Sequence, residues 1–325
     1  MKRRSLTFSV LSVLILVVFA FGYSMKKQKS KNIRWGYIAH YSLLQGTKID
    51  DILKRAENYT HLGITGFAAD KNGNIYTPIP PVTLNMIISR LQKMDKVLIP
   101  VIGLKSLKDG KQILNSETTQ KNIIGSIKRI QKQMNTSHVQ FDFEYLQPSM
   151  VDEYGAFLKK VRSGLSGSSI SAAIFPKVNF PHKWAGFHDL SVIGPYLDYI
   201  VLMCYDLHRK GTGPGPVVTE EWARKNIKNA LTNMDNDDIL LGIPSYGYRW
   251  CGKGQKKKVT AISAVYASRL GRQYGFVQHP SGNLHVAWDS CKVYASDTHM
   301  IEILKNLADT YRLAGTALWR VGFEE

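Results

Sequence analysis

The chain has 325 residues, which is enough for one large α/β domain or for two smaller ones. Hydrophobic residues make up 44% of it and no low-complexity tract interrupts it, so the composition is that of a folded globular protein and not of a disordered one. The formal net charge of +18 favours anionic partners such as a cell wall or a membrane surface, although it can equally reflect a merely soluble basic surface. Zinc-finger spacings and RNA-binding signatures are absent from the sequence, so no nucleic acid is expected as a partner.

The first segment of the chain has the pattern of an export signal. The initiating methionine and three basic residues, which together make up Met1–Arg4, precede an apolar run from Ser5 to Tyr23, and four lysines follow that run. This order is typical of a signal peptide, but the apolar run is also about long enough to span a bilayer. We therefore expect residues 1–32 to be a signal peptide or an N-terminal membrane anchor with a basic tether. Residues 33–325 are then expected to be secreted or membrane-anchored, with the folded domain outside the cytoplasm.

From Ile33 onward, short apolar runs typical of β-strands alternate with amphipathic stretches typical of helices. The eight predicted strands are Ile33–Ala39, Thr60–Ala68, Lys96–Ile102, His138–Tyr145, Ser169–Phe175, Leu197–Tyr205, Ile239–Tyr246 and Thr316–Val321. The helical patterns between them include Thr83–Met94, Thr118–Met134, Met150–Leu165, Glu220–Asn233 and Thr298–Leu313. Nearly continuous hydrophobic strands indicate a parallel sheet with both faces covered. Eight such strands predict a closed (β/α)8 barrel.

One segment departs from this alternation. Residues at about 249–297, between the seventh and eighth strands, have β-like and loop character, and we expect a small insertion on the barrel rim. Cys251 and Cys291 in this region could form a disulfide, whereas Cys204 lies in an apolar run and is expected in the core. No cysteine or histidine spacing predicts a metal site, and no glycine-rich loop follows the first strand, so neither a metal nor a nucleotide cofactor is expected.

The fourth predicted strand carries two acidic side chains on one face. Polar and apolar residues alternate along Val139–Tyr145, so Gln140, Asp142 and Glu144 point to the same side. On a surface hairpin this polar face would simply meet water. Helical patterns on both flanks favour a strand inside a barrel instead, with its polar face directed into the interior.

In a barrel, the carboxyl end of a strand is where active-site residues lie. Two acids buried there are costly unless they share a proton, and this coupling raises the pKa of one of them. A carboxylic acid with a raised pKa can donate a proton near neutrality. Glu144, nearer the mouth, is the better proton donor, and Asp142 is placed to orient it.

The chain resembles glycoside hydrolase family 18, the chitinase family. The family's fourth-strand motif D-x-x-D-x-D-x-E corresponds to Ser137–Glu144, which keeps the last two acids. Further matches follow in order on the predicted strands: Gly36–Tyr37, Phe67–Ala68, Met203–Asp206, Leu241–Gly247 and Leu318–Arg320. The resemblance covers about residues 33–325, and details such as Gly213–Val217 are similar to bacterial cell-wall members, including spore-cortex glucosaminidases.

The resemblance implies a substrate-assisted, retaining mechanism in which the N-acetyl group of the substrate is the nucleophile. Glu144 would be the acid and then the base, Asp142 would orient the acetamido group, and Tyr205 would hydrogen-bond its oxygen. Asp206 would contact sugar hydroxyls and Trp319 would form the floor beneath the sugar at which cleavage occurs. Residues of lower rank that would line the site or bind substrate are Tyr37, Met203, Tyr246 and Gln140.

The expected function is cleavage of β-1,4 linkages in a polysaccharide that contains N-acetylated amino sugars, either peptidoglycan or a chitin-like polymer. The alternative is a non-catalytic glycan-binding protein on the same barrel, and Glu144 argues against it because lectin-like relatives usually lose that acid. Gln140 replaces a family Asp or Asn. As an amide it could still hydrogen-bond Asp142 but could not take a proton, which predicts a reduced rate or a shifted pH optimum.

Overall fold

The structure is a computed structural model that describes residues 32–44, 49–252 and 258–325. The predicted signal peptide or anchor therefore lies outside the described residues. Within the described residues, no helix combines the length and the apolar character needed to cross a bilayer. Residues 32–325 form one compact unit.

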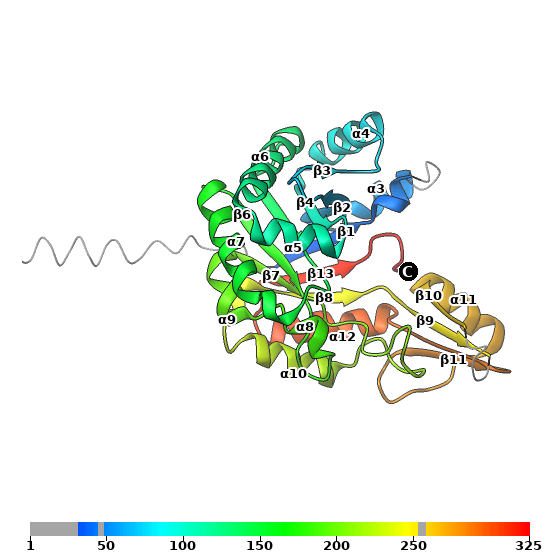
Figure 1. The fold of residues 1–325 in the computed structure, drawn as a ribbon. Coiled ribbons are helices and arrows are strands. Elements are labelled where there is room, and N and C mark those ends of the chain that lie inside the picture. The colour runs from blue at the N-terminus through cyan, green and yellow to red at the C-terminus, as the bar shows by residue number, and fades with distance from the viewer. Residues whose placement is uncertain (1–31, 45–48, 253–257) are drawn as a thin grey trace, which may run out of the picture. The chain divides into compact units, whose positions relative to one another are not determined.

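Eight parallel strands close into a barrel, as the sequence predicts (Figure 1). Their bounds are β1 Ile33–Ile38, β2 His61–Ala69, β4 Val97–Leu104, β5 His138–Asp142, β6 Ser169–Ile174, β7 Tyr199–Leu202, β8 Ile239–Pro244 and β13 Gly315–Trp319. The barrel closes because β1 pairs with β13 on one side and with β2 on the other. A short strand, β3 (Ile75–Tyr76), adds antiparallel to the end of β2.

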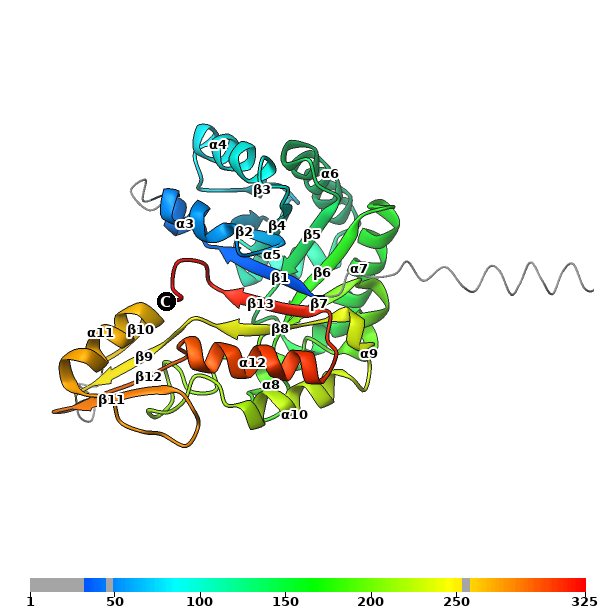
Figure 2. The same ribbon diagram turned by 180° about the vertical axis from the view of Figure 1, so that it is seen from behind.

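Helices surround these strands in both views (Figures 1 and 2). The longer ones are α3 Ile49–Ala56, α4 Pro81–Gln92, α5 Leu107–Asn115, α6 Glu117–Met134, α7 Val151–Gly164, α10 Glu220–Ala230 and α12 Thr298–Thr310. The short ones are α2 His40–Leu43, α8 His182–Ala185 and α9 Leu190–Ile193, with 3₁₀ turns η2 Pro148–Met150, η3 Gly194–Tyr196 and η4 Asn236–Asp238.

The ends of α6 illustrate how the local sequence sets a helix. The Ser116 hydroxyl accepts a hydrogen bond from the backbone N–H of Thr119, which caps the first turn. Asn135 ends the helix with a φ of 46°, a left-handed conformation that Asn tolerates better than most residues. The predicted helix, Thr118–Met134, differs from this element by one residue at its start.

The alternation on β5 separates the hydrophobic shell from the barrel interior. Phe141 and Phe143 point outward and pack on α7, where the Phe143 ring stacks on Phe157 with centroids 5.9 Å apart. Gln140 points inward and has no solvent exposure. Burial of each phenylalanine stabilises the fold by about 1.5–3 kcal/mol, so a register slip that turned these rings inward would be strongly disfavoured. The surface-hairpin interpretation of this segment is therefore excluded.

The predicted insertion is a four-stranded antiparallel sheet that lies beyond the carboxyl end of β8 (Figure 1). Its elements are β9 Tyr246–Cys251, β10 Lys258–Ser263, α11 Ala264–Tyr274, β11 Leu284–Trp288 and β12 Cys291–Ala295. Cys251 and Cys291 are directly opposite each other on β9 and β12 and form a disulfide. Cys204 is a free, buried thiol, as expected for a core residue.

Candidate active site

A cleft of about 140 Å³ opens at the carboxyl ends of the barrel strands. It is lined by Tyr37, Asp142, Glu144, Ala173, Met203, Tyr205, Asp206, Tyr246 and Trp319. These side chains come from β1, the end of β5 and the segment after it, β6, the segment after β7, the start of β9 and the end of β13, so the barrel gathers residues that lie far apart in the sequence. All the site residues predicted from the sequence line this cleft except Gln140, which lies beneath it.

The two carboxyl groups in the cleft are hydrogen-bonded to each other. Burial raises the pKa of Asp142 to about 6, although its hydrogen bond with Glu144 partly offsets this. Burial, and then the neighbouring charge of Asp142, raises the pKa of Glu144 well above its usual range. The proton that the pair shares near neutrality therefore resides on Glu144. A protonated Glu144 beside a charged Asp142 is the arrangement that a general acid requires.

Tyr145 is a residue of this site that the sequence pattern does not identify. Strand alternation would turn it away from Glu144, but β5 ends at Asp142, and Tyr145, three residues later, has a left-handed backbone conformation with a φ of 60°. Its hydroxyl hydrogen-bonds the Glu144 carboxyl group, which favours the charged form and moderates the rise in the pKa of Glu144. The ring remains 47% exposed at the edge of the cleft.

Asp206 is held by two tyrosine hydroxyls. Its Oδ1 atom accepts a hydrogen bond of 2.6 Å from Tyr246 and one of 2.8 Å from Tyr248. Burial raises the pKa of Asp206, while these two hydrogen bonds and the charge of Arg209 act in the opposite direction. Tyr248 was not among the predicted site residues, although its position two residues after Tyr246 on a strand places both rings on one face.

Gln140 is not bonded as the sequence suggested. Its Oε1 atom accepts a hydrogen bond of 2.7 Å from the Tyr37 hydroxyl, which reaches across the barrel from β1. The structure contains no hydrogen bond between Gln140 and Asp142, and both Gln140 Nε2 and Asp142 Oδ1 are buried without a partner among the described residues. Tyr37 in turn contacts Trp319, with ring centroids 5.4 Å apart. Gln140 therefore acts on the cleft through Tyr37.

His188 fixes the backbone on which Glu144 is carried. Its Nε2 atom faces the carbonyl oxygen of Phe143 at 2.9 Å, and its Nδ1 atom accepts a hydrogen bond of 3.0 Å from the Phe175 N–H. Burial lowers the pKa of His188 to about 4, so the ring is neutral at neutral pH. His188 thus ties the ends of β5 and β6 together, a contact between distant segments that no local sequence pattern reveals.

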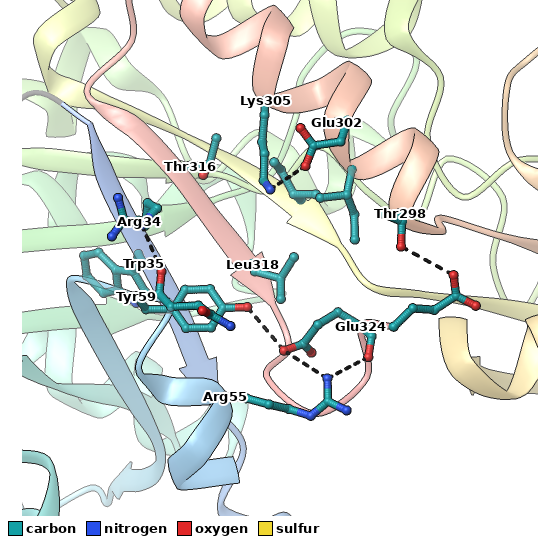
Figure 3. Close-up of a pocket in the computed structure, with 14 residues that line it drawn as sticks. Arg34, Trp35, Arg55, Tyr59, Thr298, Glu302, Lys305, Thr316, Leu318 and Glu324 are labelled. Atoms are coloured by element: carbon teal, nitrogen blue, oxygen red, sulfur yellow. Dashed lines mark hydrogen bonds and ion pairs between the residues drawn. The ribbon is translucent and has the colours of Figure 1, made fainter. Parts of the chain in front are cut away.

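A larger hollow of about 390 Å³ lies on the outside of the barrel, among β1, α3, α12 and the end of the chain (Figure 3). Its acidic side chains already have partners. Glu324 accepts a hydrogen bond from Tyr59 and lies 3.8 Å from Arg55, and Glu302 pairs with Lys305 at 2.6 Å (Figure 3). This hollow therefore lacks a pair of adjacent, coupled carboxyl groups such as Asp142 and Glu144 in the cleft. Among the described residues, no group of three or more His, Cys, Asp or Glu side chains is arranged to hold a metal ion.

Comparisons with known proteins agree with this geometry. The sequence model of the family described as "Glycosyl hydrolases family 18" matches residues 18–324. The cortical fragment-lytic enzyme of Bacillus subtilis (strain 168) is 26% identical over 305 residues, which are 86% of this chain and 69% of that protein. The enzyme of the same name from Bacillus anthracis is 24% identical over 289 residues, covering 81% of this chain and 65% of that protein.

Solved structures share the fold. The spore cortex-lytic enzyme SleL of Bacillus cereus superposes with a TM-score of 0.80 at 23% identity, covering 92% of this chain and 72% of the other. A chitinase from Chromobacterium violaceum ATCC 12472 also gives a TM-score of 0.80, at 18% identity, over 90% of this chain and 95% of the other. At these identities the likeness establishes the barrel architecture, and the site must be argued from its own residues.

Proposed function

The chain belongs to the glycosyl hydrolases of family 18 and is a glycosidase, and from that membership we propose that it cleaves β-1,4 linkages of a bacterial cell-wall glycan containing N-acetylglucosamine. The observation that carries this proposal is the convergence of Asp142 and Glu144 beside Tyr205 in one cleft of the barrel. In this pair burial and the charge of Asp142 raise the pKa of Glu144 well above its usual range, so Glu144 keeps the proton, whereas Asp142, with a pKa raised only to about 6, is charged at neutral pH.

The proposed reaction uses the substrate's own acetamido group as the nucleophile. Glu144 gives its proton to the glycosidic oxygen while the acetamido oxygen attacks the anomeric carbon, so the glycosidic bond breaks as the new carbon–oxygen bond forms. The negative charge of Asp142 holds the acetamido N–H and offsets the positive charge on the cyclic oxazolinium ion. Water then attacks the anomeric carbon as Glu144 takes its proton, and the product has the original anomeric configuration.

The other residues of the cleft position the sugar. Tyr205 donates a hydrogen bond to the acetamido oxygen as it attacks, which its place next to both acids supports. Trp319 offers an apolar ring as the floor of the cleft, and Met203 and Tyr246 complete the wall. Asp206 has one carboxylate oxygen bonded to two tyrosines, and we assign its other oxygen to sugar hydroxyls.

Two observations favour peptidoglycan, or its spore-cortex form, over chitin. Relatives along 81–86% of the chain are named for cortical fragments, and the net charge of +18 suits an anionic wall. We accordingly propose that residues 33–325 act outside the cytoplasm. A non-catalytic glycan-binding role on the same barrel would not require the coupled acids.

The test is to incubate the fragment of residues 32–325 with peptidoglycan and with N-acetylglucosamine oligomers, beside the same fragment carrying Glu144→Gln. We expect new reducing ends from at least one of the two substrates, and a rate lower by about 10²–10⁴-fold in the variant, the usual contribution of a general acid. Equal release by both proteins would remove Glu144 from its role. Binding without release by either protein would replace the proposal with the glycan-binding one.

A further inference from the structure

A group of aromatic rings forms one edge of the cleft. The segments after β5 and β6 bring together Tyr145, Phe175, Phe180 and Trp184, which we call the aromatic rim. Tyr145 contacts Phe175 and Trp184 with centroid distances of 5.4 and 5.5 Å. Because Tyr145 directly follows Glu144, the rim lies next to the place where the glycosidic bond would be cleaved.

The guanidinium group of Arg209 is packed against this rim. Its Cζ atom lies 4.5 Å from the ring centroid of Trp184 and 4.9 Å from that of Phe180. Its Nη1 atom also donates a hydrogen bond of 2.7 Å to the carbonyl oxygen of Asp206, on the segment that lines the cleft. Cation–π contacts and this hydrogen bond hold the cation in one position.

Arg209 nevertheless has no anion as a direct partner. No carboxylate among the described residues lies within salt-bridge distance of it, and its Nε atom is buried without a hydrogen-bond partner. The charge of Arg209 lowers the pKa of Asp206, but the hydrogen bonds from the two tyrosine hydroxyls lower it more. A largely enclosed guanidinium normally pairs with a carboxylate or a phosphate through its planar fork. Arg209 is thus a fixed cation with donors to spare.

From this arrangement we infer that Arg209 binds a carboxylate on the sugar that adjoins the one held in the cleft. The carboxylate would be carried either directly on that sugar or on a short peptide attached to it. The inference rests on the proposed function, because it requires that the cleft hold a sugar of an N-acetylglucosamine polymer. It adds that the enzyme distinguishes acidic wall glycans from neutral ones such as chitin, with Arg209 as the residue that sets this specificity.

The experiment measures binding in the Glu144→Gln background, in which the ligand is not consumed. The ligands are a peptide-free tetrasaccharide of alternating N-acetylglucosamine and N-acetylmuramic acid, the same tetrasaccharide with its carboxyl groups reduced to alcohols, and a peptide-bearing form. Calorimetry gives the ratio of dissociation constants for the reduced and acidic forms. We expect the acidic form to bind about 10–100-fold more tightly, as a hydrogen bond to a charged group provides.

Adding Arg209→Gln should bring this ratio to about one, whereas Arg209→Lys, which keeps the charge but not the fork, should leave an intermediate ratio. Lys210→Gln removes the exposed neighbouring cation and serves as the matched control, with the ratio unchanged. If Arg209→Gln weakens the acidic and reduced forms equally, Arg209 only supports the Asp206 segment and the inference is overturned. If Arg209→Gln changes the affinity for neither form, the inference is overturned as well.

The remaining arms separate the sources of the carboxylate and the two proposals. If only the peptide-bearing form binds more tightly than the reduced tetrasaccharide, the carboxylate is on the peptide. If the peptide-free acidic form also binds more tightly than the reduced one, the carboxylate is on the sugar. Hydrolysis of neutral N-acetylglucosamine oligomers by the chain with Glu144 intact supports the glycosidase activity whether or not Arg209 discriminates. If the protein distinguishes acidic from reduced glycans but hydrolyses none of them, the proposed glycosidase function is contradicted and the carboxylate site is still supported.

Discussion

At the scale of single residues, the pH dependence of activity follows from the coupled carboxyl pair. The active form has Glu144 protonated and Asp142 charged, and the pKa of Asp142 is raised to about 6 by burial. We expect kcat/KM to fall on the acid side as Asp142 takes up a proton near that pH, and on the alkaline side as Glu144 loses its proton. A pH series of kcat/KM checks this, and full activity persisting at pH 4 would contradict the assignment.

Gln140 provides a second prediction on the same groups. Gln140→Asp adds a third carboxyl group beneath the cleft, and repulsion between like charges should raise the pKa of Asp142 further. The acid limb of the pH–rate profile should therefore move to higher pH, by about half a unit or more. Gln140→Asn, which shortens the side chain and adds no charge, is the control and should leave that limb in place. An unchanged profile in Gln140→Asp would show that position 140 is not coupled to the pair.

Sequence reasoning identified site residues where a regular strand pattern decides their direction. The alternation on β5 placed Asp142 and Glu144 on the inner face, and the resemblance supplied residues on other strands such as Tyr205 and Trp319. It did not identify Tyr145 or His188, because the position of Tyr145 depends on a left-handed turn and that of His188 on contacts across 45 residues of chain. It also considered a hydrogen bond from Gln140 to Asp142 possible, since nothing local reveals that the Tyr37 hydroxyl reaches Gln140 from the opposite side of the barrel.

At the scale of secondary-structure elements, strands and helices were predicted to within a few residues because hydrophobic periodicity is strong in a covered parallel sheet. The internal order of the insertion could not be predicted. Its strands pair in the order β10-β9-β12-β11, which depends on tertiary contacts between segments of similar character. The disulfide between Cys251 and Cys291 follows from this order, since it makes the two residues direct neighbours on adjacent strands.

Gly247 lies on β9 between Tyr246 and Tyr248, and its lack of a side chain allows β9 to pack closely on β12. A Cβ atom at this position would lie 1.9 Å from the carbonyl oxygen of Tyr294 and 2.4 Å from the Cα atom of Ala295. We expect Gly247→Ala to separate β9 from β12, with a loss of about 2 kcal/mol or more in the free energy of unfolding and a lower kcat, because Tyr246 and Tyr248 would no longer hold Asp206.

Denaturant unfolding and steady-state kinetics measure the two effects. Gly213→Ala is the matched control, because a Cβ atom there meets no atom within 4 Å. If Gly247→Ala were as stable and as active as Gly213→Ala, the close packing of β9 on β12 would not matter to the site.

At the scale of the whole molecule, barrel closure is what turns scattered motifs into one site. Tyr37 and Trp319 are 282 positions apart in the sequence, yet they lie on the neighbouring strands β1 and β13, and the two rings are in contact. Eight apolar runs in order were sufficient to predict this closure. The segments that carry the aromatic rim and Arg209 are loops and the single-turn helix α8, and their contacts depend on tertiary packing that the sequence pattern does not reveal.

The central claim is that Glu144 protonates the leaving group. The most direct measurement compares Glu144→Gln with the parent chain on an N-acetylglucosamine oligomer and on the same sugar linked to 4-nitrophenol, following the first turnover. A nitrophenolate leaves without a proton, so we predict a loss of about 10²–10⁴-fold on the oligomer and a much smaller loss on the aryl glycoside. Equal losses on both substrates would contradict the account.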